Sequence, residues 1–136
     1  MATESFQLNL HGAWDNQLVE RTANGQTVEK YALALNEKFK PQHATWKSEG
    51  LGFNDWAWES HQLAERLAYG KLNRKIPVET PQPIASCADD NQIAMRMLKL
   101  NEKVGPAYAA AVAPTVEEQL AKSGFRLALI LNQIWP

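Results

Sequence analysis

The chain has 136 residues, a formal net charge of −1, and 45% hydrophobic against 21% charged residues. This length suits one ordinary domain that can bury its own core. The near-zero charge excludes a protein that holds nucleic acid by phosphate neutralisation alone, so any nucleic-acid chemistry must rely on metal and local pockets. The single cysteine, Cys87, excludes an internal disulfide and leaves a buried thiol or pairing with another chain or a missing segment. No apolar run reaches the roughly 18 residues of a membrane span.

The first predicted helix runs from Leu10 to Glu20, with Asn9 as its cap. Apolar residues recur every four positions, at Leu10, Trp14 and Leu18. His11 and Asp15 share the adjacent stripe, one turn apart, so their side chains leave the same face. An imidazole nitrogen and a carboxylate oxygen at this spacing can hold one zinc ion. The spacing alone favours a surface hydrogen bond over a metal site.

Two more helices are predicted before the middle of the chain. The first runs from Thr27 to Phe39, capped by Thr27 and stopped by Pro41. Its buried face is expected to hold Val28, Tyr31, Leu35 and Phe39. The second is capped by Asn54 or Asp55 and ends near Tyr69.

The second half of the chain opens with a proline-rich connector, 72–86, and becomes helical again from Asp89 or Asp90. Gly105-Pro106 interrupts the run, and apolar residues then keep helical spacing to the end, with Pro114 inside the pattern. Pro114 removes a backbone donor, so a kink or a restart is expected there. No segment alternates with period 2. We therefore predict an all-α fold, a bundle of about five helices with a C-terminal helix kinked near Pro114.

Other chemical signals favour structural roles. There is no glycine-rich phosphate loop, no G-x-S-x-G turn and no H-E-x-x-H pair. His61 has only Glu65 at a useful ligand spacing, so we expect an ordinary surface or partly buried histidine. The tryptophans are expected to pack in the core rather than stack on bases. A solvated face with i,i+4 pairs is the simplest interpretation of four charged residues near the end of the chain, Glu117, Glu118, Lys122 and Arg126.

Three stretches carry a resemblance to a known family. Asn9-Leu10-His11-x-x-Trp14-Asp15 resembles a motif of the S-one/P-one nucleases, zinc-dependent and mostly single-strand-specific enzymes related to bacterial phospholipase C. Trp56-Ala57-Trp58-Glu59-Ser60 resembles the start of a family helix. The ending from Tyr108 to Asn132, with its internal proline and its Gly-Phe-Arg-Leu-Ala run, resembles the family's last helix. The resemblance covers nearly the whole chain in the right order.

By this resemblance, residues 1–136 are a single all-α unit corresponding to the C-terminal half of the nuclease domain. His11 and Asp15 would be two ligands of one zinc ion, in a cluster of three ions whose other ligands lie upstream in the family. The resemblance assigns no catalytic residue to this chain and implies at most one weak zinc site. We expect hydrolysis of phosphodiester bonds in single-stranded DNA or RNA to require the N-terminal half, so the isolated chain should show weak or no activity.

Two rival interpretations remain open. The chain could be a catalytically dead helical remnant, a binding or assembly module that forms a homodimer to bury uncovered apolar faces. A phospholipase-type substrate is disfavoured because the related lipases usually carry glutamate where Asp15 stands. Met1 to Phe6 lacks the features of a signal peptide, although the family is mostly secreted or periplasmic, so the compartment is not predicted. No membrane partner is expected.

Overall fold

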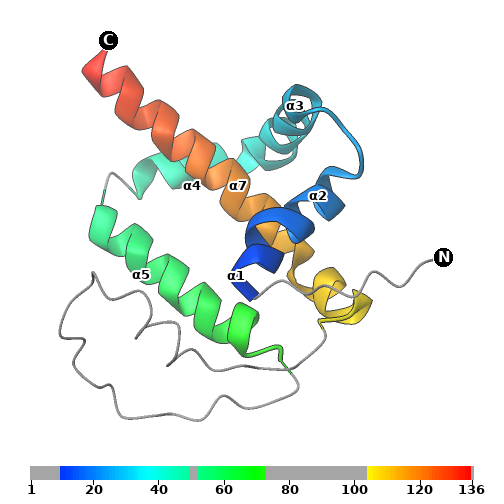
Figure 1. Ribbon diagram of the computed structural model, residues 1–136. Helices are drawn as coiled ribbons and strands as arrows, with labels where there is room; N and C mark the ends of the chain where they lie inside the picture. Colours follow the sequence, from blue (N-terminus) through cyan, green and yellow to red (C-terminus); the bar gives the residue numbers. More distant parts are fainter. Residues whose placement is uncertain (1–9, 50–51, 73–103, 136) are drawn as a thin grey trace, which may run out of the picture.

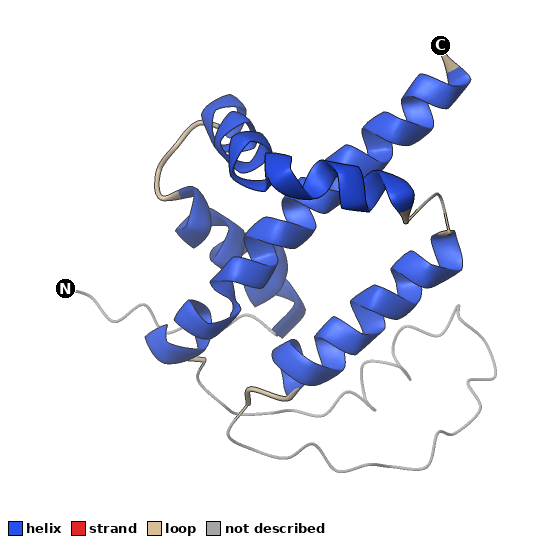
Figure 2. Cartoon of the chain, turned by 180° about the vertical axis from the view of Figure 1, so that it is seen from behind, coloured by secondary structure: helices blue, strands red, loops and turns tan. Residues whose placement is uncertain are grey.

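A computed structural model describes residues 10–49, 52–72 and 104–135, and all the regular elements in these ranges are helices (Figure 1). The all-α prediction is confirmed. The long helix α7 (Pro106–Ile134) runs diagonally through the molecule in both views, with the N-terminal helices lying against it (Figure 2). Within the described ranges, no helix has the length and apolar character needed to cross a membrane. The cap Asn9, Cys87, most of the proline-rich connector and the helix expected from Asp89 or Asp90 lie outside the described residues.

The predicted first helix is a helical path of three consecutive pieces. These are α1 (Leu10–Gly12), the π-helical segment η1 (Ala13–Gln17) and α2 (Leu18–Ala23). The path ends at Asn24, which has a φ of 49°, followed by Gly25 with a φ of 74°. Asparagine and glycine are the residues that best tolerate this left-handed conformation, so the predicted Asn-Gly turn is confirmed.

Helix α3 (Val28–Phe39) matches its prediction except at its first residue. The Thr27 hydroxyl accepts a hydrogen bond from the Lys30 amide at 3.4 Å and caps the helix. Three side chains spaced four residues apart are buried, namely Tyr31, Leu35 and Phe39. The expectation that Val28 is buried is wrong, because its side chain is 81% exposed. Val28 lies in the first turn of α3, whereas α4 packs at the other end of this helix, against Phe39.

Pro41 ends α3 as predicted, and the chain continues through the short 3-10 helix η2 (Lys40–Gln42) into α4 (His43–Ser48). Trp46 of α4 is only 3% exposed. It joins the buried face of α3 in one apolar cluster, against which Phe125 of α7 also packs. The prediction that tryptophan serves the core is confirmed for this residue.

Helix α5 (Phe53–Leu63) continues into a second π-helical segment, η3 (Ala64–Tyr69). Its cap is Gly52, so the predicted cap at Asn54 or Asp55 is wrong by two to three residues. Asp55 is instead the third residue of the helix, and its carboxylate folds back over Gly52, where a Cβ would collide with it. A carboxylate at this position is favoured by the positive end of the helix dipole.

Helix α7 begins at Pro106, after the cap Gly105, and passes through Pro114 without interruption. A restart at Pro114 is therefore excluded, and the alternative of a kink stays a prediction. The first half of the helix supplies three buried residues that pack on Leu18 of α2, namely Ala109, Val112 and Val116. Val112 is fully buried. Since α2 and α3 both lie against α7, this helix is the centre of the fold.

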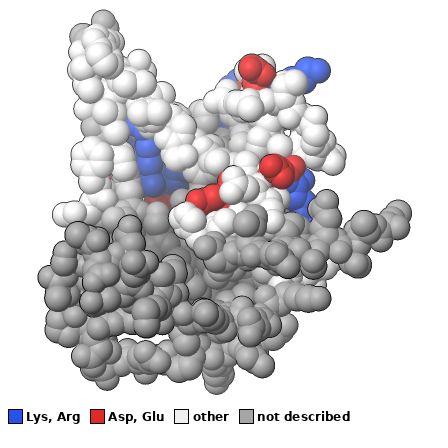
Figure 3. Space-filling view, viewed as in Figure 1, with Lys and Arg blue, Asp and Glu red and all other residues white. Residues whose placement is uncertain are grey.

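The second half of α7 keeps the predicted apolar rhythm but leaves it exposed. Four apolar side chains of this half lie on one face of the helix and are 36–58% exposed. We call them the α7 stripe: Leu120, Leu127, Leu131 and Ile134. Residues 127–135 include no charged side chain, and this end of the helix forms a white column at the upper left of Figure 3. Periodicity predicted the apolar face correctly, but this face is not buried within the described part of the chain.

Candidate functional site

His11 and Asp15, the predicted metal ligands, project from the same helical face into solvent. His11 Nε2 lies 2.8 Å from Asp15 Oδ2, and the two side chains are 81% and 57% exposed. The structure thus brings the two donor atoms together at the surface. Two donors at this separation can approach one zinc ion after a small movement, since tetrahedral Zn–N and Zn–O bonds of about 2 Å place ligand atoms roughly 3.3 Å apart.

The residue between them, Trp14, is fixed to two distant parts of the chain. Its indole N–H donates to the Tyr108 hydroxyl oxygen at 2.8 Å. The Tyr108 hydroxyl in turn donates to the Ala68 carbonyl at 2.8 Å. Burial raises the pKa of Tyr108, although the hydrogen bond from Trp14 acts in the opposite direction. The phenol therefore stays protonated at neutral pH and remains a donor to Ala68.

The donor set fits one part of a zinc site rather than a whole one. Zinc sites in proteins use three or four protein ligands. In the described part of the chain, no group of three or more His, Cys, Asp or Glu residues stands close enough to hold a metal ion. The other two histidines pack on aromatic rings: His61 stacks on Trp58 at 5.2 Å, and His43 on Phe125 at 4.5 Å, between ring centroids.

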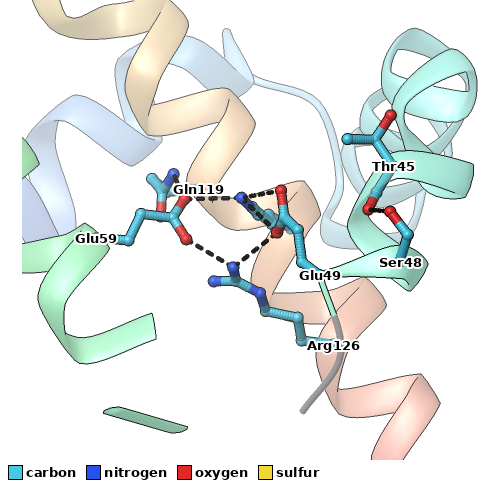
Figure 4. A network of polar contacts seen from close by, with 7 residues as sticks. Thr45, Ser48, Glu49, Glu59, Gln119 and Arg126 are labelled. Atoms are coloured by element: carbon cyan, nitrogen blue, oxygen red, sulfur yellow. Dashed lines mark hydrogen bonds and ion pairs between the residues drawn. The ribbon is translucent and has the colours of Figure 1, made fainter. Parts of the chain in front are cut away.

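A second polar cluster was missed by the sequence analysis. Four charged side chains form an ion-pair network in which Lys122 and Arg126 of α7 each contact both Glu49 and Glu59 (Figure 4). The shortest contact joins Arg126 Nη2 to Glu59 Oε2 at 2.6 Å, and Lys122 Nζ lies 2.8 Å from Glu59 Oε1. The prediction of a solvated face is wrong for Lys122 and Arg126, which are only 6% and 8% exposed.

The reason for this error is that their partners lie on other helices. Glu59 comes from α5 and Glu49 follows α4, so the network ties both to α7. The Arg126 guanidinium also lies 4.7 Å from the centre of the Trp56 ring, a cation–π contact. A signal was present in the sequence, because Glu59 and Arg126 belong to the two downstream stretches that resemble the nuclease family.

Hydrogen bonding lowers the pKa of Glu59. Burial alone raises this pKa and is the largest single influence, but hydrogen bonds from Lys122, Arg126 and Gln119, together with the charge of Lys122, outweigh it. The folded state therefore favours the Glu59 carboxylate more than the unfolded state does.

We expect the network's contribution to stability to be complete at neutral pH and to be lost as the pH falls through the lowered pKa of Glu59. Stability rises with pH wherever the unfolded state binds more protons, which here is the interval below the ordinary glutamate pKa of 4.5. Urea unfolding across this interval should show a weaker pH dependence in Glu59→Gln than in the wild type. Glu37→Gln is the matched control, since Glu37 is an exposed partner of Lys40. Equal slopes in Glu59→Gln and the wild type would contradict the expectation.

An open pocket of about 520 Å³ lies beside the network, between α5, η3 and α7. Its walls carry three carboxylates, Glu59, Glu65 and Glu118, against one guanidinium, Arg66. Because Glu59 is already paired with Lys122 and Arg126, the remaining charges of the walls are nearly balanced, and the pocket offers no positive surplus that would hold a nucleic-acid backbone.

Comparisons with known proteins agree with the resemblance. A family model described as S1/P1 Nuclease matches residues 2–136. Endonuclease 4 of Arabidopsis thaliana is 29% identical over 134 residues, covering 93% of this chain and 38% of that protein. Endonuclease 3 of the same plant is 28% identical, covering 95% of this chain and 39% of that protein. The chain thus spans about two fifths of the length of the curated relatives that it matches. No solved structure matches the chain.

Proposed function

Because the chain belongs to the S1/P1 nuclease family, we propose that it is the C-terminal portion of a zinc-dependent nuclease acting on single-stranded DNA or RNA. In this proposal it contributes His11 and Asp15 to the metal centre and the helical scaffold that carries them. Hydrolysis requires the N-terminal portion of the domain, so the isolated chain has weak or no activity.

The observation that carries the proposal is the geometry of the His11–Asp15 pair. Two donor atoms of the types that bind zinc lie 2.8 Å apart on an exposed face. The tryptophan between them donates a hydrogen bond to Tyr108, which in turn donates to Ala68, so the pair stands on an anchored turn and not on a loose surface helix. The His11 and Asp15 side chains are exposed, which is unusual for the ligands of a complete metal site. This exposure is what we expect of a partial site that further ligands from the N-terminal portion complete.

The residues of this chain have separate parts in the chemistry. His11 and Asp15 would hold a zinc ion, which when bound would supply Lewis-acid chemistry, that is, a water of pKa lowered to about 7 and stabilisation of phosphate charge. His11 donates through Nε2 and must be neutral to do so, and Asp15 donates through a carboxylate oxygen. Trp14 holds the turn through its indole N–H. The remaining ligands, and the groups that select base and sugar, are expected from the N-terminal portion.

The exposed α7 stripe supports the need for a further part. A face with 36–58% exposed leucine and isoleucine side chains, and without a charged residue over 127–135, is typical of a surface that packs against another element. The relatives have more than half of their length outside the matched region, which is enough polypeptide to cover it. We infer that the N-terminal portion of the nuclease domain packs against the α7 stripe.

Zinc binding tests the proposed site directly. We expect the 136-residue chain to bind one zinc ion weakly, and the imidazole NMR signals of His11 to shift on addition of zinc chloride. The His11→Ala variant should lose more than about tenfold in affinity, because outer partners of a ligand alone contribute roughly 10–100-fold.

The matched control is His61→Ala, which removes an exposed histidine that stacks on Trp58 and should leave zinc affinity unchanged. Binding of three zinc ions, or cleavage of single-stranded DNA by the chain alone, would contradict the assignment as an incomplete portion. An equal loss of zinc affinity in His11→Ala and His61→Ala would contradict the assignment of His11 as a zinc ligand. A chain with no zinc affinity at His11 would instead favour the helical binding module.

A further inference from the structure

The turn that carries the His11–Asp15 pair has an unusual backbone. The Leu18 amide donates to the Ala13 carbonyl, five residues earlier, which is the pattern of a π-helix. Asp15 lies inside this segment and His11 lies in the α-helical turn before it. The angle between their side chains about the helix axis therefore depends on the π geometry being kept. Such single-turn π segments are rare and occur frequently at functional sites.

A side-chain relay connects this turn to the rest of the fold. Trp14, the second residue of the π segment, donates to the Tyr108 hydroxyl of α7, and that hydroxyl donates to the Ala68 carbonyl of η3. Trp14 and Tyr108 also pack against the apolar cluster around Leu18 and Val112. One phenol oxygen thus joins α7 to two other helical segments, η3 and η1, through residues that are 40 and 94 positions away from Tyr108 in sequence.

We propose that Tyr108 is a positioning residue for the His11–Asp15 pair, an inference that rests on the proposed zinc site. Its hydroxyl fixes the indole of Trp14, and through Trp14 it fixes the π turn that sets the two donor atoms side by side. Tyr108 touches neither the metal nor the substrate in this role.

The hydroxyl can be tested apart from the packing of the ring. A Tyr108→Phe substitution keeps the aromatic ring against its apolar neighbours but leaves the Trp14 N–H and the Ala68 carbonyl without this partner. The chain offers a matched control in Tyr31→Phe, because the Tyr31 hydroxyl also makes a partly buried hydrogen bond, to Thr22 Oγ1 at 2.7 Å. Thr22 lies in α2, outside the π turn.

Two readouts on the full 136-residue chain decide the matter. Hydrogen exchange of the Leu18 amide, measured without metal, reports directly on the π hydrogen bond and should become at least about tenfold faster in Tyr108→Phe. Titration with zinc chloride, followed at the His11 imidazole, should show about tenfold weaker affinity, as expected for loss of an outer partner. Tyr31→Phe should change neither quantity, whatever it does to global stability.

The outcomes separate this inference from the function on which it rests. If the wild type binds zinc at His11 and Tyr108→Phe binds it with the same affinity, only the positioning role is overturned. Unchanged exchange of the Leu18 amide in Tyr108→Phe overturns it as well. Absence of zinc binding at His11 in the wild type overturns the proposed function, and this inference with it.

Discussion

Replacing Arg126 with alanine is expected to lower the free energy of unfolding by about 3 kcal/mol. The guanidinium contacts Glu49 at 3.1 Å and Glu59 at 2.6 Å, and its side chain is only 10% exposed. Removing it leaves two carboxylates that face Lys122 alone, and an unbalanced buried charge is far more costly than a missing pair. The estimate is at the lower end of the usual range because the Glu49 and Glu59 side chains, 36% and 27% exposed, keep contact with solvent.

Urea unfolding followed by circular dichroism measures this loss, provided that the denaturant slope is unchanged. The matched control is Lys38→Ala, which breaks the pair between Lys38 and Glu117 on the surface, where the lysine side chain is 53% exposed. That change should cost below about 1 kcal/mol. Arg126→Lys should fall between the two, because it keeps the charge but not the planar group over Trp56. An Arg126→Ala cost no larger than that of Lys38→Ala would show that the network adds nothing to stability.

Trp46→Ala is expected to have a similar effect for a different reason, about 3–5 kcal/mol through loss of buried apolar contact. Trp46 is 3% exposed, and its ring lies 5.9 Å from the Phe39 ring and 5.8 Å from the Phe125 ring, between centroids. Since this cluster joins α3, α4 and α7, the cavity left by the indole weakens the contacts between all three helices.

Trp58→Ala is the natural comparison, because Trp58 is 60% exposed and stacks only on His61 among the ring contacts of the described residues. Substitutions on the surface usually change stability by no more than about 0.5 kcal/mol. Thermal unfolding of the two variants should therefore differ by many degrees. Equal melting temperatures would mean that Trp46 does not anchor the cluster.

Local sequence patterns were sufficient for the features that depend on neighbours along the chain. The apolar spacing and Thr27 gave α3 nearly to its ends, and the spacing of His11 and Asp15 placed both on one face. The π segment η1 could not be predicted, because a window with a 3.6-residue period does not distinguish it from an α-helix.

Local sequence patterns also failed to predict the features that depend on residues far away in the sequence. Lys122 and Arg126 stand beside Glu118 in the sequence, and this local arrangement predicted an exposed face. Their actual partners are 63 to 77 residues away, and nothing in a helical repeat reports such pairing. The exposure of the α7 stripe was unpredictable for the same reason, since periodicity identifies an apolar face but not what covers it.

The long separation in sequence between α2 and α7 has a consequence for biosynthesis. Leu18 of α2 finds its buried apolar neighbours on α7, about ninety residues further along the chain. A ribosome adds roughly 5–20 residues per second, so the earlier helices are made several seconds before the element that completes their core. Folding of this region is therefore delayed until residues 109–116 of α7 have left the ribosomal tunnel, and until then the earlier helices carry unburied apolar faces that are natural clients for chaperones.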